Sequence, residues 1–262
     1  MKATRTKFVI AEIGTGTGAK QVGSRHFLVA LNAAVVLLVC GISTTVHAQQ
    51  TVFNVPTTDA LDKGKVYFEL DISAKPNNSE ALNRFSSFVP RFIVGTGGRV
   101  EIGLNVIGNI QPGPDATQLV PTIKWKLYDG KDNGWAMAVG AHLHIPVHNK
   151  SFDVGTYEYV MVSKTFKTNT RIGAGSYFFS KNVVAPDANR AGGQFTFEQT
   201  VTKKLNINAD HFTGKMASGY FTAGAAYKLT NKLTGVAAYS IGNASPSKGN
   251  HFFYFELGYN FN

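Results

Sequence analysis

The sequence predicts a closed antiparallel transmembrane β-barrel of about twelve strands, and three observations predict it. Apolar and polar residues alternate along many short segments, which is typical of strands with one apolar and one polar face. The links between these segments alternate between short and long. The last segment, residues 251–262, has an almost wholly aromatic apolar face, which suits a strand in a membrane better than an edge strand in water.

Composition fits this class. Charged residues make up 16% of the chain, against about 25% in typical soluble proteins. The net charge is +10, but five of the 26 basic residues and one of the 16 acidic residues lie in residues 1–48, so 21 and 15 remain. Because these charges are scattered along strands and form no basic cluster, we expect no binding of nucleic acid.

Residues 1–48 read as a secretory signal peptide with a long leader. An apolar run, residues 27–42, is followed by small residues that suit cleavage after Ala48. The run is too short and wrongly flanked for a stable membrane span. Cys40 is preceded by Leu and Val rather than by a small residue, which disfavours acylation as a lipoprotein. A chain that begins at Gln49 has no Cys and no disulfide.

The remaining chain divides in two. Residues 49–63 show no period and are interpreted as a periplasmic lead-in, and residues 64–262 are interpreted as the barrel. Pro90 and Pro121 fall inside two expected strands, so we expect bulges or strand ends there. The twelve expected strands are residues 66–73, 88–94, 99–106, 119–127, 135–145, 155–166, 171–178, 194–198, 205–210, 221–229, 233–241 and 253–262.

The links between the expected strands are of two lengths. Short links at residues 95–98, 128–134, 167–170, 202–204 and 230–232 alternate with longer ones. Outer-membrane barrels show this, with tight periplasmic turns and longer external loops. Both chain ends of the barrel then lie on the periplasmic side, which requires an even strand count. A secreted β-sandwich is the alternative fold, but its outward faces would be richer in charge than these rows of Asn, Thr, Gly and Ser.

The closing strand resembles those of the bacterial outer-membrane β-barrel class. Gly258, Tyr259 and Phe261 match the pattern of a Gly, alternating aromatics and an aromatic at the end, although Asn262 makes that aromatic penultimate. The resemblance implies a place in the bacterial outer membrane and contact with its lipid and lipopolysaccharide. It also implies that the barrel-assembly machinery reads Gly258, Tyr259 and Phe261.

In a barrel of this size the polar face points into the lumen. Its two signs of charge nearly balance, so the lumen could be a hydrated pore or a cross-linked network that blocks passage. The lumen-facing candidates are Glu69, Asp71, Arg99, Glu101, Lys124, Lys126, His142, His144, Arg171, Glu198, Asp210, Lys228 and Glu256. Further charged residues assigned to the same face are Lys65, Arg91, Glu158 and Lys164.

The sequence contains few residue patterns that are typical of a catalytic site. His142 and His144 face one side of a strand and could bind a metal or exchange protons, but polar lining is the favoured interpretation. Asp210 and His211 are adjacent, so their side chains point to opposite faces. No G-x-S-x-G motif occurs. We therefore expect no catalytic residue, cofactor or metal.

The predicted function is a passive pore for small hydrophilic solutes. The alternative is a structural or surface-interaction barrel with a plugged lumen, and the third is an outer-membrane hydrolase.

Overall fold

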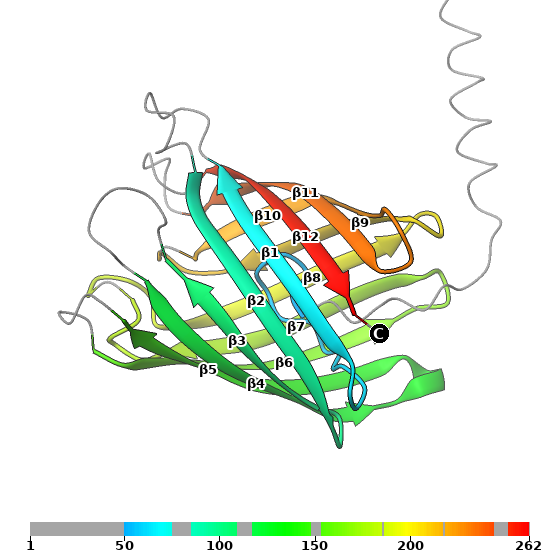
Figure 1. The fold of residues 1–262 in the computed structure, drawn as a ribbon, viewed down its shortest axis with the longest axis horizontal. Coiled ribbons are helices and arrows are strands. Elements are labelled where there is room, and N and C mark those ends of the chain that lie inside the picture. The colour runs from blue at the N-terminus through cyan, green and yellow to red at the C-terminus, as the bar shows by residue number, and fades with distance from the viewer. Residues whose placement is uncertain are drawn as a thin grey trace, which may run out of the picture. The chain divides into compact units, whose positions relative to one another are not determined.

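Twelve antiparallel strands close into one barrel in the computed structural model (Figure 1). The structure describes residues 50–74, 85–108, 117–147, 153–184, 186–216, 218–243 and 251–261, so the expected signal peptide lies outside the described residues. The strands are β1 (Val66–Ala74), β2 (Phe85–Gly97), β3 (Val100–Ile107), β4 (Gln118–Asp129), β5 (Trp135–Pro146), β6 (Gly155–Thr165), β7 (Thr170–Phe179), β8 (Ala191–Thr200), β9 (Leu205–Phe212), β10 (Tyr220–Lys228), β11 (Leu233–Gly242) and β12 (Phe252–Asn260). The predicted fold class is confirmed.

Closure depends on the pairing of the first strand with the last. Every strand pairs with its neighbours in sequence, and β1 pairs antiparallel with β12, where Phe68 lies opposite Tyr259. The sheet therefore has no free edge, and its main-chain N–H and C=O groups find partners within the barrel. This is the condition for a sheet to span hydrocarbon. No helix among the described residues is long and apolar enough to cross a membrane.

The two rims of the barrel differ in the length of their links. Residues 98–99, 130–134, 166–169, 201–204 and 229–232 connect strands at one rim, here called the turn end. Longer links, residues 75–84, 108–117, 147–154, 180–190, 213–219 and 243–251, connect them at the other rim, the loop end. A 3-10 helix, η2 (Lys131–Asn133), lies in one of the short links.

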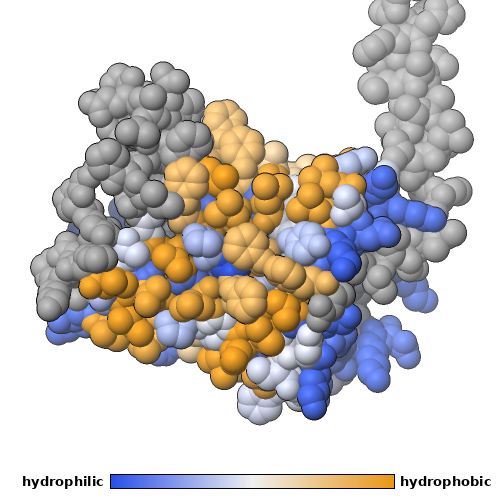
Figure 2. Space-filling model, viewed as in Figure 1, coloured by the Kyte–Doolittle hydropathy of each residue, from blue (hydrophilic) through white to orange (hydrophobic). Residues whose placement is uncertain are grey.

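The outer face carries the apolar side of each strand. On β12, Phe253, Phe255, Leu257 and Tyr259 are exposed, whereas Tyr254 and Glu256 are buried inside. Figure 2 shows many orange, apolar side chains gathered over the strands, with a few paler residues between them. A patch of this extent is disfavoured in water, so the surface suits contact with hydrocarbon.

The two prolines within strands are accommodated by gaps in pairing. Pro90 pairs with Leu70 of β1, and the register of β2 with β3 begins only at the next residue. Pro121 pairs with Leu104 of β3, but the register of β4 with β5 passes from Leu119 directly to Thr122. Each proline thus sits where one neighbouring ladder is interrupted, as a residue without an N–H requires.

A tyrosine and a glycine pack closely together at the seam where β1 pairs with β12. A Cβ atom at Gly258 of β12 would overlap the hydroxyl and ring of Tyr67 from β1. The missing side chain therefore makes room for a buried aromatic ring, whose hydroxyl donates to Glu256 Oε1 at 3.3 Å. The seam of the barrel is packed as well as hydrogen-bonded.

Residues 50–61 run inside the barrel, as the blue segment in Figure 1 shows, and residues 62–63 are exposed. Val52, Phe53 and Val55 are 0% exposed, although they belong to no strand. The interpretation of residues 49–63 as a lead-in did not include this packing of residues 50–61 inside the barrel. Apolar side chains in a segment without a period gain more by packing against the lumen wall than by facing water.

We predict that Gly258→Ala destabilises the closed barrel, because overpacking a tight site costs about 1–3 kcal/mol. The temperature at which the barrel loses its heat-modifiable mobility in SDS gels measures this. Gly235→Ala is the matched control, since its Cβ would meet only the flexible side chains of Leu229 and Leu257. Tyr67→Phe removes the hydroxyl that the new Cβ would overlap most closely, so the loss caused by Gly258→Ala should be smaller in the Tyr67→Phe background than in the unmodified barrel. An unchanged transition in Gly258→Ala would contradict the packing role.

Candidate functional site

The candidate site is the occupied lumen, and its central feature is residues 50–61, here called the lumen segment. The segment folds back on itself: Thr51 bridges antiparallel to Pro56, and the Thr57 N–H donates to the Gln50 carbonyl at 3.0 Å. The Val52 N–H donates to the Val55 carbonyl at 2.9 Å across the bend. Phe53 and Asn54 therefore form the tip of a narrow loop.

A single carboxylate holds this tip. Asp210 Oδ2 accepts the main-chain N–H groups of Phe53, Asn54 and Val55 at 3.1, 2.7 and 2.9 Å. Successive N–H groups that converge in this way form an anion-binding nest. Asp210 lies on β9 and is 2% exposed, so its charge is balanced by these donors rather than by water.

Apolar contacts fix the two sides of the tip. Val52 and Phe53 pack in a cluster on the wall formed by β10, β11 and β12, where the Phe53 ring meets Tyr254 edge-on at 5.8 Å between centroids. The Tyr254 hydroxyl also donates to the Phe53 carbonyl at 3.3 Å. Val55 packs on the opposite side against a cluster that includes Tyr157 and Tyr177. The loop therefore bridges two walls of the barrel.

Towards the turn end, polar contacts hold the rest of the segment. The Thr58 and Ser163 hydroxyls are 2.6 Å apart, and the Leu61 N–H donates to Glu101 Oε2 at 2.8 Å. The Asp59 carboxylate forms an ion pair with the Arg171 guanidinium and accepts a hydrogen bond from it. Arg171 also donates two 2.7 Å hydrogen bonds to Glu198 on β8. One guanidinium thus ties the segment to two strands.

A second basic group reaches the segment from β4. Lys124 Nζ donates to the Gln50 carbonyl at 3.2 Å and pairs with Glu101 at 2.8 Å. Further along β4, Lys126 Nζ lies 2.9 Å from Asp129 and 3.9 Å from Asp59. Gly95 of β2 permits the close approach of the segment, because a Cβ there would overlap the main chain of residues 61–62.

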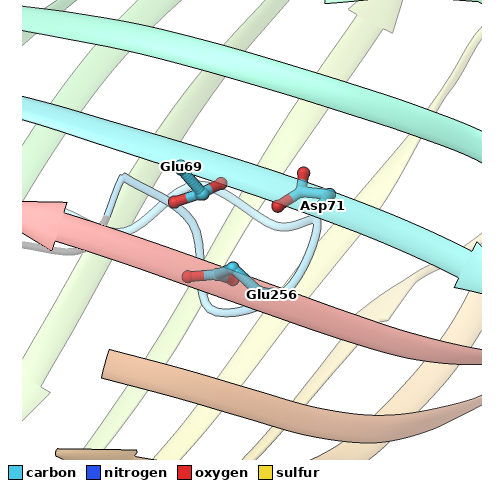
Figure 3. Close-up of side chains that lie close together, drawn as sticks. All are labelled: Glu69, Asp71 and Glu256. Carbon is cyan, nitrogen blue, oxygen red and sulfur yellow. The ribbon is translucent and has the colours of Figure 1, made fainter. Parts of the chain in front are cut away.

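Three acids gather at the closing seam. Glu69 and Asp71 of β1 and Glu256 of β12 place carboxylate oxygens within 4.8 Å of one another (Figure 3). Arg91 of β2 pairs with Glu69 at 3.2 Å and with Asp71 at 2.6 Å, and its NH1 group donates to Thr51 Oγ1 of the segment.

Oxygen ligands of this kind suit hard cations, and in the described part of the chain this is the one acidic or histidine cluster that could hold a metal. Arg91 already supplies positive charge to Glu69 and Asp71. Glu256 accepts hydrogen bonds from the Tyr67 and Tyr254 hydroxyls at 3.3 and 3.1 Å. The three carboxylates thus share one guanidinium and two hydroxyl donors.

Aromatic side chains fill the loop end of the lumen on the side of β6 and β7. The Tyr157 ring stacks on Tyr159 at 5.4 Å and on Phe179 at 4.7 Å. His142 meets the Tyr157 ring edge-on at 5.0 Å, whereas His144 Nδ1 lies 2.9 Å from Gln118 Oε1. The two histidines thus have different partners, and these partners are not metal ligands or a catalytic acid.

The structure places most predicted lumen residues inside the barrel. Buried or largely buried there, and in contact with each other or with the lumen segment, are Glu69, Asp71, Glu101, Lys124, Lys126, Arg171, Glu198, Asp210 and Glu256. His142 and His144 are partly buried next to Tyr157 and Gln118.

Five of the charged residues assigned to the lumen lie elsewhere or at its margin. Lys65 directly precedes β1 and is exposed. Arg99 is exposed in the link between β2 and β3 with φ 63°, which takes it out of the strand pattern. Lys228 is the last residue of β10 and partly exposed. On β6 the phase is the reverse of the one assigned: Tyr157, Tyr159 and Met161 point inward, and Glu158 is exposed. Lys164 lies over the outward-facing Trp135 ring at 5.2 Å. Aromatic residues therefore occupy the inner face of β6, where polar side chains were expected.

Sequence reasoning missed the lumen segment and assigned Arg91 no role beyond polar lining. Residues 50–61 carry apolar side chains at Val52, Phe53, Val55 and Leu61 without a strand period. That mismatch was the available signal: a short link has no reason to carry so many apolar side chains unless they are covered.

No protein-family model matches this sequence, and no curated protein matches it. Solved structures do. The KdgM porin in complex with disordered oligogalacturonate is similar with a TM-score of 0.52 and 9% identity, over 76% of this chain and 99% of that chain. An outer membrane channel from Pseudomonas putida F1 is similar with a TM-score of 0.50 and 14% identity, over 78% and 97%. The chain has the fold of an outer-membrane β-barrel. At these identities the likeness concerns the fold alone.

We predict that Asp210→Ala releases the tip of the lumen segment. Three buried N–H groups lose their charged acceptor, and each hydrogen bond to a charged group contributes about 1.5–3 kcal/mol. Hydrogen exchange in lipid nanodiscs should show faster exchange, by at least tenfold, for peptides that cover residues 52–56. His211→Ala, one residue on and facing outward, is the control and should leave this exchange unchanged. Equal protection in both variants would refute the anchor.

We predict that strong acid loosens the part of the segment near Asp59. Burial raises the pKa of Asp59, but the charges of Arg171, Lys126 and Lys124 outweigh it and hold that pKa below its usual range. A carboxyl whose pKa is lowered on docking stabilises the docked state above its ordinary pKa, and this stabilisation is lost as the pH falls through the lowered value.

A spin label at Ala60→Cys reports on this transition. The label should stay immobile at neutral and mildly acidic pH and become mobile only below the usual range of an aspartate. In an added Asp59→Asn background the label should be more mobile at neutral pH and lose this pH dependence. A label equally immobile in the Asp59→Asn background would contradict the prediction.

Proposed function

We propose that this protein is an outer-membrane channel for small hydrophilic solutes whose lumen is closed at rest by its own residues 50–61. The observation that carries the proposal is the contrast between the barrel wall and its contents. The wall is a complete, closed sheet with a polar and charged inner face. The lumen segment is a single loop attached to it by side-chain contacts rather than by sheet pairing with the barrel strands.

The surroundings of the barrel follow from its surface. The apolar outer face suits the lipid of the bacterial outer membrane, with lipopolysaccharide at the loop end and the periplasm at the turn end. The expected signal peptide, cleaved after Ala48, would deliver the chain through the inner membrane. We propose that the barrel-assembly machinery reads Gly258, Tyr259 and Phe261 during insertion. The similar structures, a porin and an outer membrane channel, support a channel.

The size of the barrel is compatible with passage. Eight-stranded barrels are filled by their own side chains, whereas barrels of 16–18 strands leave an aqueous channel. A barrel of twelve strands lies between these limits. Here the inner wall binds the lumen segment with residues from β2, β3, β4, β6, β7, β9 and β12. Displacement of the segment would leave this polar wall to water.

The test compares single-channel currents of two refolded chains in planar bilayers. A chain that begins at Gln49 should show rare or small openings. A chain that begins at Asp62 should show stable, ohmic steps, because the lumen segment is absent. If the shorter chain folds, inserts and remains silent, the channel proposal is overturned.

A disulfide provides a second test that leaves the segment in place. Thr58 and Ser163 hold their hydroxyl oxygens 2.6 Å apart, so Thr58→Cys/Ser163→Cys should form a disulfide, whose S–S length is about 2.0 Å. A chain that begins at Gln49 has no other Cys. Oxidation should abolish the openings that remain in the full chain, and reduction should restore them. Openings that persist in the fully oxidised protein would exclude the segment as the gate.

The structural or surface-interaction barrel is the second candidate, and the filled lumen favours it over an open pore. It predicts silence from both chains in the bilayer. The hydrolase has less support, because His142, His144 and His211 contact a tyrosine, a glutamine and an asparagine rather than a serine.

A further inference from the structure

We propose that the lumen contains a peptide-binding site, of which residues 50–61 are the built-in occupant, and that the channel takes up short peptides with apolar and acidic side chains. The inference rests on the proposed channel function and names its solute class. The lumen segment is treated as a ligand that is covalently tethered to its own binding site. Its contacts then show what the site recognises.

The site forms hydrogen bonds with the main chain of its occupant. Asp210 accepts three successive N–H groups, and Glu101 accepts the N–H of Leu61. Lys124 and Tyr254 donate to the carbonyls of Gln50 and Phe53. Any peptide offers these donors and acceptors, whatever its side chains. An oligosaccharide offers hydroxyl groups but no row of N–H groups at peptide spacing.

Two apolar clusters add a side-chain preference. Val52 and Phe53 belong to one, together with Ala226, Val236, Ala238 and Tyr254. Val55 belongs to the other, on the opposite wall, which includes Tyr157, Tyr159 and Met161. Residues separated by a tight bend therefore reach opposite walls. Peptides with apolar residues on both sides of such a bend could make the same two sets of contacts.

A basic position recognises one carboxylate. Arg171 binds Asp59 while keeping Glu198 as its second partner, and Lys126 lies 3.9 Å from the same carboxylate. All three groups are largely buried. In a free peptide, an acidic side chain or the terminal carboxylate could take the place of Asp59. Guanidinium groups are well matched to carboxylates.

The lumen segment also satisfies a buried charge of the barrel wall. Asp210 is buried, and three N–H groups surround one of its oxygens. A buried carboxylate without such donors is costly. A solute that supplies equivalent N–H groups can exchange with the segment without leaving this charge bare. A bound peptide could therefore replace the lumen segment at Asp210 without leaving the carboxylate unpaired.

The test uses the refolded chain that begins at Asp62 and a synthetic peptide with the sequence of residues 50–61. The peptide should block its current in a concentration-dependent manner and bind it in detergent micelles by calorimetry. The same peptide N-methylated at the positions of Phe53, Asn54 and Val55 should bind at least about tenfold more weakly, because loss of one hydrogen bond to a charged group already has about this effect.

The lumen wall is tested with matched variants. Asp210→Ala should weaken binding of the unmodified peptide at least about tenfold, whereas His211→Gln, its outward-facing neighbour, should leave binding unchanged. Unrelated peptides of four to six residues with apolar and acidic side chains should also produce transient blocks. Neutral oligosaccharides of similar size should not.

Equal binding of the N-methylated peptide, or stronger block by oligosaccharides than by peptides, would overturn the assignment of peptides as the solute class. These outcomes are separate from failure of the channel proposal. Currents that no peptide blocks would leave the channel intact and reject the peptide site. Calorimetric binding to a silent but folded barrel would reject the channel and keep the peptide site.

Discussion

The structure depends on one constraint: main-chain N–H and C=O groups that face hydrocarbon must be paired within the protein. The pairing of β1 with β12 meets it by leaving no sheet edge. Once the barrel is closed, strand alternation determines the rest, since each residue faces either lipid or lumen. Gly258 and Tyr67 show how tightly the seam is built, because the ring of one lies where the side chain of the other would be.

Closure of the barrel leaves charged side chains inside the lumen, where they need partners. Side chains that face inward are shielded from bulk water, and charges in such a place require partners. The wall supplies some of them, as in the pairs of Lys124 with Glu101 and of Arg91 with Glu69 and Asp71. The lumen segment supplies others through the N–H groups at Asp210 and the carboxylate at Arg171. In the channel that we propose, the same contacts that stabilise the interior also close the passage.

The resulting site combines two kinds of recognition. Main-chain groups of the segment meet Asp210, Glu101, Lys124 and Tyr254, and its apolar side chains meet two separate clusters. Because the segment is attached through wall side chains rather than by a continuous ladder, the opening that we propose requires no change in the pairing of the barrel strands.

The sequence alone determined the barrel, because alternation with period two appears directly in the residue order. It gave strand positions, an even strand count and the outward phase of the closing aromatics at Phe253, Phe255 and Tyr259. It failed on β6, where Tyr157, Tyr159 and Met161 fill the lumen and reverse the expected phase. Only the tertiary structure decided what fills the barrel. The contacts of Asp210 with Phe53 and of Arg171 with Asp59 join residues more than 100 positions apart, and no local pattern encodes such distant pairs.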